Sequence, residues 1–151
     1  SAIINAFIPE AVVLPILVFV GISSYSQAFE VVDKKYFPAV IMASLPVVMD
    51  FIVDNMREGA LPGFTAFDPG SAFVGLLVGC VFVFIIDNNW KNASITNAAA
   101  LALTGIGMIH SPGILGTAAY APDMGFVQVY IVLMIVFAVM HFVGFNQKKT
   151  A

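Results

Sequence analysis

Three ionisable side chains interrupt long apolar stretches of this sequence: Glu10, Asp50 and His110. Ionisable groups at membrane depth are costly, and they usually face a cavity, a partner or a transport pathway. Asp50 follows the apolar run Val47–Met49, so its carboxylate is a candidate site for coupling to a proton or another cation. Glu10 is a candidate for ion binding or gating. His110, whose imidazole can change charge near neutral pH, is a candidate proton relay.

Each of the three also has a structural interpretation. Asp50 lies one turn below a predicted outer interface, where its carboxylate could reach water beside those of Asp54 and Glu58. Glu10 follows Pro9 at the start of the first apolar run, where proline fits the first helical turn and a carboxylate faces the positive end of the helix dipole. His110 could bond the free carbonyls at a helix C-terminus. The sequence leaves both interpretations open for each residue.

Enzymatic chemistry has no support in the sequence. There is no H-E-x-x-H zinc motif, no G-x-x-x-x-G-K-[ST] phosphate loop and no G-x-S-x-G nucleophile motif. Cys80 is the single cysteine, so neither an intrachain disulfide nor a thiolate metal cluster is available. A net charge of −3 disfavours nucleic acid as a partner, because nucleic acid requires clustered Lys and Arg. We therefore expect no enzyme activity, no cofactor and no bound metal.

The composition indicates that these side chains belong to a membrane protein. Hydrophobic residues make up 60% of the chain and charged residues 10%, whereas soluble domains have roughly 45–50% and about 25%. The mean hydropathy is +0.98. A helix needs roughly 20 apolar residues to cross the hydrocarbon core. We expect an all-α bundle, forming a single transmembrane domain, from five apolar segments: Ile3–Ile22, Tyr36–Val53, Gly70–Ile86, Asn97–His110 and Gly125–Phe145.

The basic residues predict how these segments are oriented. If all five cross, five Lys residues fall on one side of the membrane and one Arg falls on the other. The Lys residues are Lys34, Lys35, Lys91, Lys148 and Lys149, and the Arg is Arg57. Because cytoplasmic loops carry the excess of Lys and Arg, we expect an outside N-terminus and a cytoplasmic C-terminus in a bacterial inner membrane. Without a crossing by 97–110 the bias would disappear, although a re-entrant fourth segment buried in protein is also compatible.

Proline and small residues predict kinked, closely packed helices. Pro15 and Pro46 each remove one backbone hydrogen bond inside a segment. Two pairs have the small-xxx-small spacing that favours close helix contact: Gly75 with Gly79, and Ala98 with Ala102.

The connections and the aromatic residues complete this topology. We expect Ser23–Lys35 to form a polar cytoplasmic corner. Asp54–Pro69, rich in turn formers, predicts either a solvated hairpin or a short re-entrant lid. His141 is expected to form an interfacial or interhelical hydrogen bond. Four aromatic residues lie at or near predicted interfaces, as in an aromatic belt: Tyr36, Trp90, Tyr120 and Tyr130.

Three phrases of the sequence resemble the C-terminal part of the xanthine/uracil permease (nucleobase–cation symporter) family, especially its bacterial adenine/guanine/hypoxanthine-type and uncharacterised branches. They are IPEAVVLPILVFVGI at 8–22, YFPAV at 36–40 and GIGMIHSP at 105–112. The resemblance covers most of this chain but only the last third of a usual family member.

This resemblance implies a fold of two inverted seven-helix repeats, with a core domain that holds the substrate and a gate domain that moves against it. The first three segments would correspond to the closing helices of the gate domain. The family's substrate-holding acidic residues lie upstream, so no binding residue is carried over to this chain. The two segments after the third depart from the family pattern, and they put the exact helix correspondence in doubt.

Two hypotheses follow. The first is that the chain is the gate-type end of a longer nucleobase permease-like secondary transporter. It would not transport alone, and its expected partners are the lipid bilayer, the remaining core domain and further copies in a homo-oligomer. The second is a small integral-membrane subunit that packs against a larger membrane partner through the Gly75/Gly79 and Ala98/Ala102 faces. The sequence specifies neither the substrate nor the coupling ion.

Overall fold

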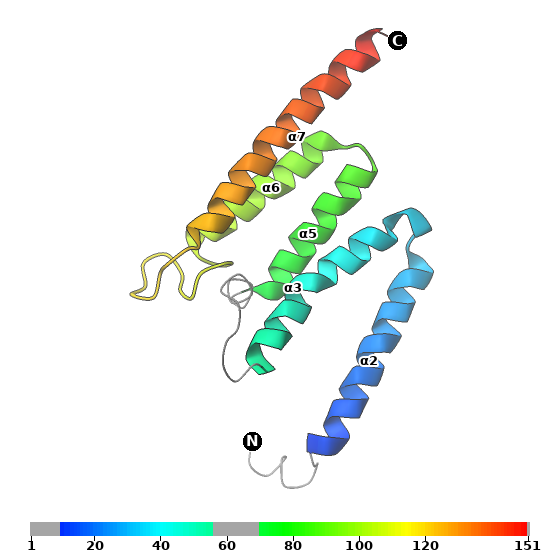
Figure 1. The fold of residues 1–151 in the computed structure, drawn as a ribbon, viewed down its shortest axis with the longest axis vertical. Helices are drawn as coiled ribbons and strands as arrows, with labels where there is room; N and C mark the ends of the chain where they lie inside the picture. Colours follow the sequence, from blue (N-terminus) through cyan, green and yellow to red (C-terminus); the bar gives the residue numbers. More distant parts are fainter. Residues whose placement is uncertain (1–9, 56–69, 151) are drawn as a thin grey trace. The chain divides into compact units, whose positions relative to one another are not determined.

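The computed structural model describes residues 10–55 and 70–150, with side chains at all of these positions except 10–14, 17, 54, 55 and 145–150. Throughout these ranges the regular structure is helical, so the all-α prediction is confirmed for the described residues. The helices are α2 (Glu10–Val31), the short 3-10 helix η1 (Lys34–Tyr36), α3 (Phe37–Asn55), α5 (Ser71–Ile86), α6 (Trp90–Ile106) and α7 (Met124–Thr150) (Figure 1).

Two stretches of helix are long and apolar enough to cross a membrane. They are Lys34–Val53, which covers η1 and α3 up to Val53, and Met124–Gly144 in α7. The apolar helix Ser71–Ile86 is shorter. The described residues therefore contain two candidate spans, which is fewer than the five predicted crossings.

The chain divides into two compact units, with the boundary between Phe37 and Pro38. In the first unit, α2 continues past its predicted end at Ile22 to Val31. The prediction was wrong here because it took the polar residues after Ile22 as a connection. Polarity ends an apolar run, but the backbone meets neither Gly nor Pro before Val31 and can stay helical.

Side-chain contacts support this extension of α2. Ser24 Oγ donates to the Val20 carbonyl at 2.8 Å, a bond that a serine makes within a helix. Tyr25 and Phe29, one turn apart, have ring centroids separated by 6.2 Å. Phe29 also meets Phe37 edge-on at 4.8 Å. These aromatic contacts hold the end of α2 against the turn that leads into α3.

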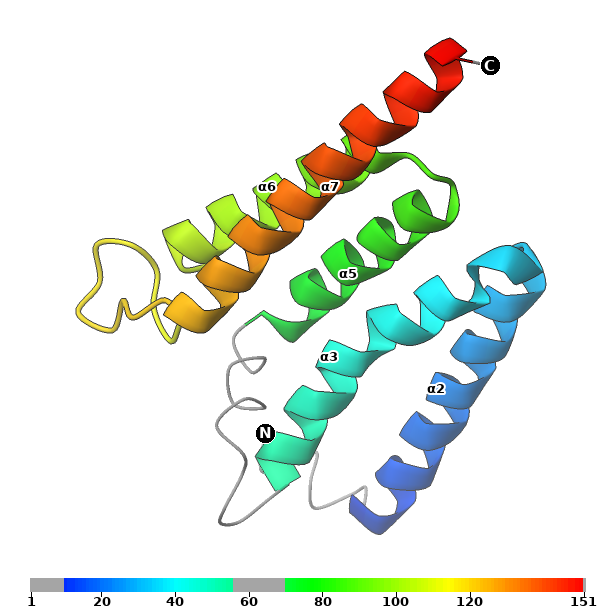
Figure 2. The ribbon, with the colours of Figure 1, turned by 45° about the horizontal axis from the view of Figure 1, so that its top comes forward.

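In the second unit α5, α6 and α7 are antiparallel neighbours, with α6 in contact with both of the others (Figures 1 and 2). Small residues allow the close approach, since Ala93 and Ala100 of α6 are fully buried. At the Trp90 end of α6, the indole lies 6.4 Å from the ring of Phe137 on α7.

Helix α6 begins earlier than predicted because an asparagine caps it. Asn89 Oδ1 accepts the backbone N–H of Asn92 at 3.2 Å, which satisfies one of the free donors of the first turn. The helix therefore starts at Trp90 and not at Asn97, and the polar residues between them belong to its first two turns.

The same helix also ends earlier than predicted. Gly107 adopts a left-handed conformation with φ 82°, and its N–H bonds the Thr104 carbonyl while the N–H of Met108 bonds the Leu103 carbonyl. This is a Schellman motif, in which glycine at this position terminates a helix. The predicted segment 97–110 is thus wrong at both ends, and His110 lies beyond the helix.

Candidate functional site

Asp50 pairs with the first residue of α5. The hydroxyl of Ser71 donates to Asp50 Oδ2 at 2.5 Å, and Ser71 is buried while Asp50 is half-buried. The carboxylate therefore lies beside the N-terminus of α5, where the helix dipole favours negative charge. Asp50 has a partner within the protein, whereas the side chain of Asp54, its predicted neighbour in water, is outside the described residues.

Close packing of α3 on α5 sets this pairing. A Cβ on Gly75 would collide with the backbone carbonyl oxygen of Ala43, and one on Gly79 would lie 2.9 Å from the Ala43 Cβ. Only glycine lets the two backbones approach this closely. One or two turns further along, the same register brings Asp50 to Ser71. The Gly75/Gly79 pair thus makes the close contact that its spacing predicted, and the neighbour is α3 of the same chain.

A second polar cluster joins His110 to α7. His110 Nε2 lies 2.9 Å from the hydroxyl oxygen of Tyr130, and the imidazole stacks on the ring of Phe126 with centroids 3.9 Å apart. His110 is 2% exposed. The Tyr130 hydroxyl can donate or accept, so this pair tolerates either neutral tautomer of the histidine. Tyr130 is buried here, whereas the sequence analysis placed it near an interface.

Asn97 extends this cluster along α6. Its Nδ2 donates to the backbone carbonyl of Tyr130 at 2.5 Å, and its side chain is 2% exposed. Thr104, two turns further along the same face of α6, is also buried and donates to the Ala100 carbonyl at 2.9 Å. Buried polar groups are tolerated when they are hydrogen-bonded. Tyr130 therefore connects α7 to α6 through its backbone carbonyl and to His110 through its hydroxyl.

The backbone of His110 is held in an uncommon conformation. Its φ of 56° lies in the left-handed region, where a non-glycine residue is disfavoured. The Asp123 N–H donates to the His110 carbonyl at 2.9 Å, and the neighbouring Ser111 hydroxyl donates to the Gly113 carbonyl at 2.7 Å. Residues in such conformations persist where their surroundings fix them, and they are frequent at functional sites.

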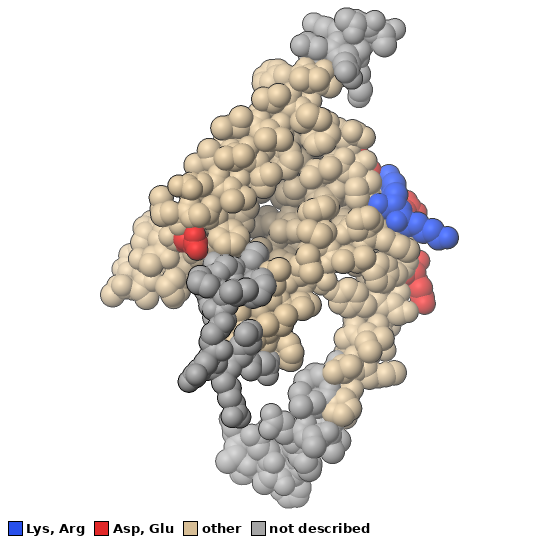
Figure 3. Space-filling model, in the orientation of Figure 1, with Lys and Arg blue, Asp and Glu red and all other residues tan. Residues whose placement is uncertain are grey.

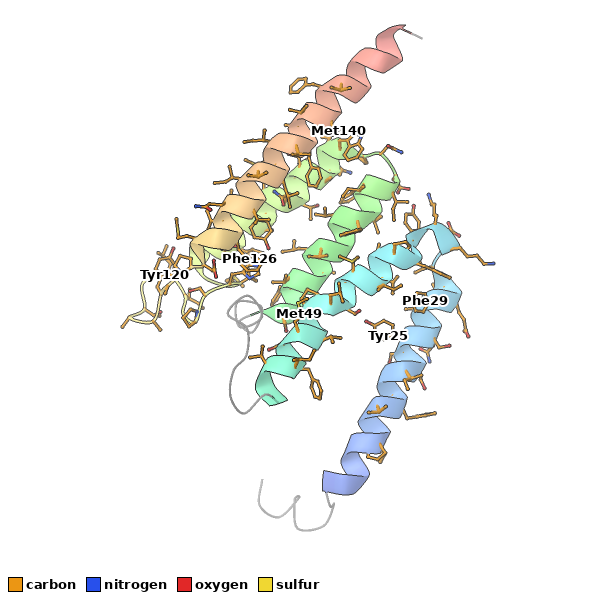
Figure 4. All side chains as sticks on the ribbon, viewed as in Figure 1. Tyr25, Phe29, Met49, Tyr120, Phe126 and Met140 are labelled. Atoms are coloured by element: carbon orange, nitrogen blue, oxygen red, sulfur yellow. The ribbon has the colours of Figure 1, made fainter. Side chains whose placement is uncertain are left out.

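The two polar clusters meet at the same end of the second unit. A Cβ on Gly70 would lie 2.7 Å from the Met108 carbonyl oxygen and 2.9 Å from the Ile109 side chain. Gly70 precedes Ser71, which bonds Asp50, and Ile109 precedes His110, which pairs with Tyr130. Figure 4 shows Met49, next to Asp50 on α3, and Phe126 at the start of α7. The ends of α3 and α6 and the beginnings of α5 and α7 thus converge.

Of the three candidate residues from the sequence, Asp50 and His110 are brought to this end. The side chain of Glu10 lies outside the described residues, and so do Arg57 and Glu58. The sequence analysis missed the partners Ser71, Asn97 and Tyr130. Asn97 could have been found as an amide directly before an alanine run, but nothing in the sequence distinguishes Tyr130 from the other tyrosines predicted near interfaces.

Metal and thiol chemistry find no support among the described residues. No group of three or more His, Cys, Asp or Glu side chains in these ranges could hold a metal ion. Cys80 is a free, half-buried thiol on α5. His141 is exposed, with its ring centroid 6.0 Å from that of Phe142.

Comparisons of this chain with protein-family models, with curated proteins and with solved structures found no match.

Proposed function

We propose that this chain is a membrane-embedded, gate-type portion of a secondary transporter resembling the xanthine/uracil permeases. The observation that carries the membrane part is the exposure of its apolar helices. Only 11% of the Lys34–Val53 window and 6% of the Met124–Gly144 window are buried within the protein. An apolar helix in the core of a soluble protein would be mostly buried.

The surface has the character that lipid requires. Large apolar side chains of α7, including Val132, Ile135, Val139 and Phe142, are about half exposed or more. Figure 3 shows one face of the molecule, on which the described charged side chains form small spots against uncharged residues. Soluble monomers rarely expose apolar patches of more than a few hundred Å². In the hydrocarbon core of a membrane, exposing such an apolar surface costs no hydration free energy.

The orientation of the helices also supports a membrane topology. In the second unit α5, α6 and α7 alternate in direction (Figure 2), so the α5–α6 turn and the end of α7 lie on one side. Lys91 lies in the first turn of α6 on that side, and Lys148 and Lys149 belong to the last turns of α7. This arrangement agrees with a cytoplasmic C-terminus under the positive-inside rule. The five-crossing topology remains part of the proposal.

Gate-type function is supported by the proline inside α3 and by the polar groups at the helix ends. Pro46 is buried inside α3 and removes one of its backbone hydrogen bonds. Asp50 and His110 lie where four helix ends converge, and transporters of this class place polar groups at such breaks. The nucleobase substrate rests on the resemblance of 8–22, 36–40 and 105–112 to the permease family.

Transport assays test this proposal. Vesicles that contain only this chain should take up no radiolabelled purine or uracil, whereas vesicles with the longer transporter should show saturable uptake. Robust saturable uptake by the chain alone would contradict the gate-type assignment. Complete release of the chain from membranes by alkaline carbonate would contradict the membrane location itself.

The alternative is a small integral-membrane subunit. Its predicted contact faces were Gly75/Gly79 and Ala98/Ala102, and the first of these is occupied by α3. Ala102 is exposed on α6 and is free to face a partner helix. Cross-linking from position 102 to a separate protein, with a native reading frame that starts near Ser1, would favour the subunit.

A further inference from the structure

The connection between α6 and α7, residues 107–123, carries an exposed apolar tip. Ile114 is 54% exposed and Leu115 is 61% exposed, and the glycines Gly113 and Gly116 flank them. From Asn92 to Pro122 the sequence has no Asp, Glu, Lys or Arg. A loop in bulk water usually carries charged residues, and aliphatic side chains at its tip are a solubility cost.

The hydroxyl groups of this connection are hydrogen-bonded to its own backbone or to the backbone at the end of α6. Ser111 Oγ accepts the Ala121 N–H at 3.2 Å, in addition to its bond to the Gly113 carbonyl. Thr117 Oγ1 donates to the Ile114 carbonyl at 2.7 Å, and Tyr120 Oη donates to the Gly105 carbonyl at 2.7 Å. Internal pairing of this kind is what a non-helical segment needs where water is scarce.

Backbone hydrogen bonds fix the tip against the end of α6. The Leu115 N–H donates to the Ile106 carbonyl at 2.7 Å, and the Asp123 N–H donates to the His110 carbonyl at 2.9 Å. The side chains of Ile114 and Leu115 are therefore presented without the entropy cost of ordering a loose loop. Figure 4 marks Tyr120 on this connection, and tyrosine favours the membrane–water boundary.

Lipid is the occupant that these features fit. The connection that carries the tip continues into α7, whose first residue Met124 is 64% exposed and begins the apolar window. Interfaces with proteins are centred on Trp, Tyr and Arg, whereas the tip offers two aliphatic side chains between glycines. Acyl chains need neither charge nor shape complementarity. Because irregular backbone is not tolerated at the hydrocarbon centre, the boundary level is the compatible depth.

We propose that Ile114 and Leu115 insert into the headgroup–acyl boundary of the bilayer and anchor this end of the α6–α7 pair there. The proposal rests on the membrane location proposed above and adds a lipid contact to it. The anchor would hold His110, whose carbonyl is bonded within the same connection, at a fixed depth.

Fluorescence quenching in vesicles tests the anchor on the full chain. In a Cys80→Ala background, single cysteines replace Ile114, Leu115, Val132 or Lys91, and each is labelled with a small fluorophore. The vesicles contain phosphatidylcholine brominated either close to the headgroup or near the chain end, and iodide is added to the water. Val132, exposed on α7, reports the hydrocarbon depth, and Lys91, exposed at the opposite end of α6, reports water.

We expect labels at 114 and 115 to be quenched most by lipid brominated near the headgroup, and several-fold less by iodide than the label at 91. Iodide quenching at 114 and 115 equal to that at 91, with lipid quenching at 132, would overturn the anchor and leave the membrane location standing. Shielding of 114 and 115 from both quenchers would also overturn it, in favour of a protein contact. Iodide quenching without lipid quenching at 132 would overturn the membrane location itself.

Discussion

The imidazole of His110 and the phenol of Tyr130 are paired at 2.9 Å, although 20 residues separate them in the sequence. The pair connects the segment after α6 to the second turn of α7. Tyr130 also receives the Asn97 amide on its backbone carbonyl. A single residue of α7 therefore fixes both the body of α6 and the connection that follows it.

Replacing Tyr130 with phenylalanine should loosen that connection. Loss of the hydroxyl removes the Tyr130 bond to a buried ring nitrogen, and we expect a stability loss of about 1–3 kcal/mol. Thermal unfolding in detergent measures the loss, and hydrogen exchange should increase in 107–123. Tyr25→Phe is the matched control, because the Tyr25 side chain is exposed. Equal effects of the two substitutions would show that the His110–Tyr130 bond contributes nothing.

The Asp50–Ser71 hydrogen bond should appear as an energetic coupling. Hydrogen bonds to charged groups contribute about 1.5–3 kcal/mol, and residues in direct contact show non-additive effects. We expect the double substitution Asp50→Ala with Ser71→Ala to destabilise less than the sum of the single ones. Chemical unfolding of the four proteins in the cycle gives the coupling. Strict additivity would mean that the pair makes no net contribution.

Asp50→Asn tests whether this carboxylate takes part in ion coupling. The amide oxygen can still accept the Ser71 hydroxyl, so expression should be unchanged, but the group can no longer bind or release a proton. In the longer transporter that we propose above, we expect an altered pH dependence of uptake. The Ser71→Ala variant separates the two roles, because it removes the hydrogen bond and keeps the carboxylate. An unchanged pH profile for Asp50→Asn would favour the interfacial interpretation.

Two glycine-to-alanine substitutions should differ in their effect on stability. Gly75→Ala places a methyl group against the Ala43 carbonyl oxygen, and overpacking of this kind costs about 1–3 kcal/mol. Gly105→Ala in α6 meets no atom within 4 Å, so we expect it to be neutral or stabilising by about 0.5–1 kcal/mol, as alanine is in a helix interior. Thermal unfolding of both variants in detergent compares them. Similar behaviour would contradict the close approach of α3 and α5.

The sequence predicted the helices where apolar runs and breaks coincide. Tyr36–Val53 and Gly70–Ile86 agree with α3 and α5 to within two residues, because Pro-Gly and Asp-Asn pairs bound these runs. It failed at α2 and α6, where the limits depend on local backbone chemistry, and at the end of α7, which continues to Thr150 instead of ending at Phe145. The Asn89 cap and the Gly107 Schellman motif determine the ends of α6, and a hydropathy pattern predicts neither of them.

The sequence analysis predicted the ionisable residues of the candidate site and missed the neutral ones. Asp50 and His110 are conspicuous because each is rare in an apolar run, so their chemistry is visible without a structure. Their partners Ser71 and Tyr130 are ordinary residue types there. Helix packing brings them to the site, through the Gly75–Ala43 contact and the pairing of α6 with α7. Proximity between residues far apart in the chain cannot be predicted from the local sequence.

Gly70 and Ser71 occupy consecutive positions and contact different neighbours, the Met108–Ile109 backbone on one side and Asp50 on the other. A piston-like displacement of α5 along α3 would therefore break contacts on both sides at once. Sliding of these two helices past each other cannot be local, because it would also displace the segment that contains His110. Any movement at this end of the unit should therefore displace the start of α5 and the segment after α6 together. A hinge would have to lie elsewhere, and the nearest candidate is Pro46, where α3 lacks one backbone hydrogen bond.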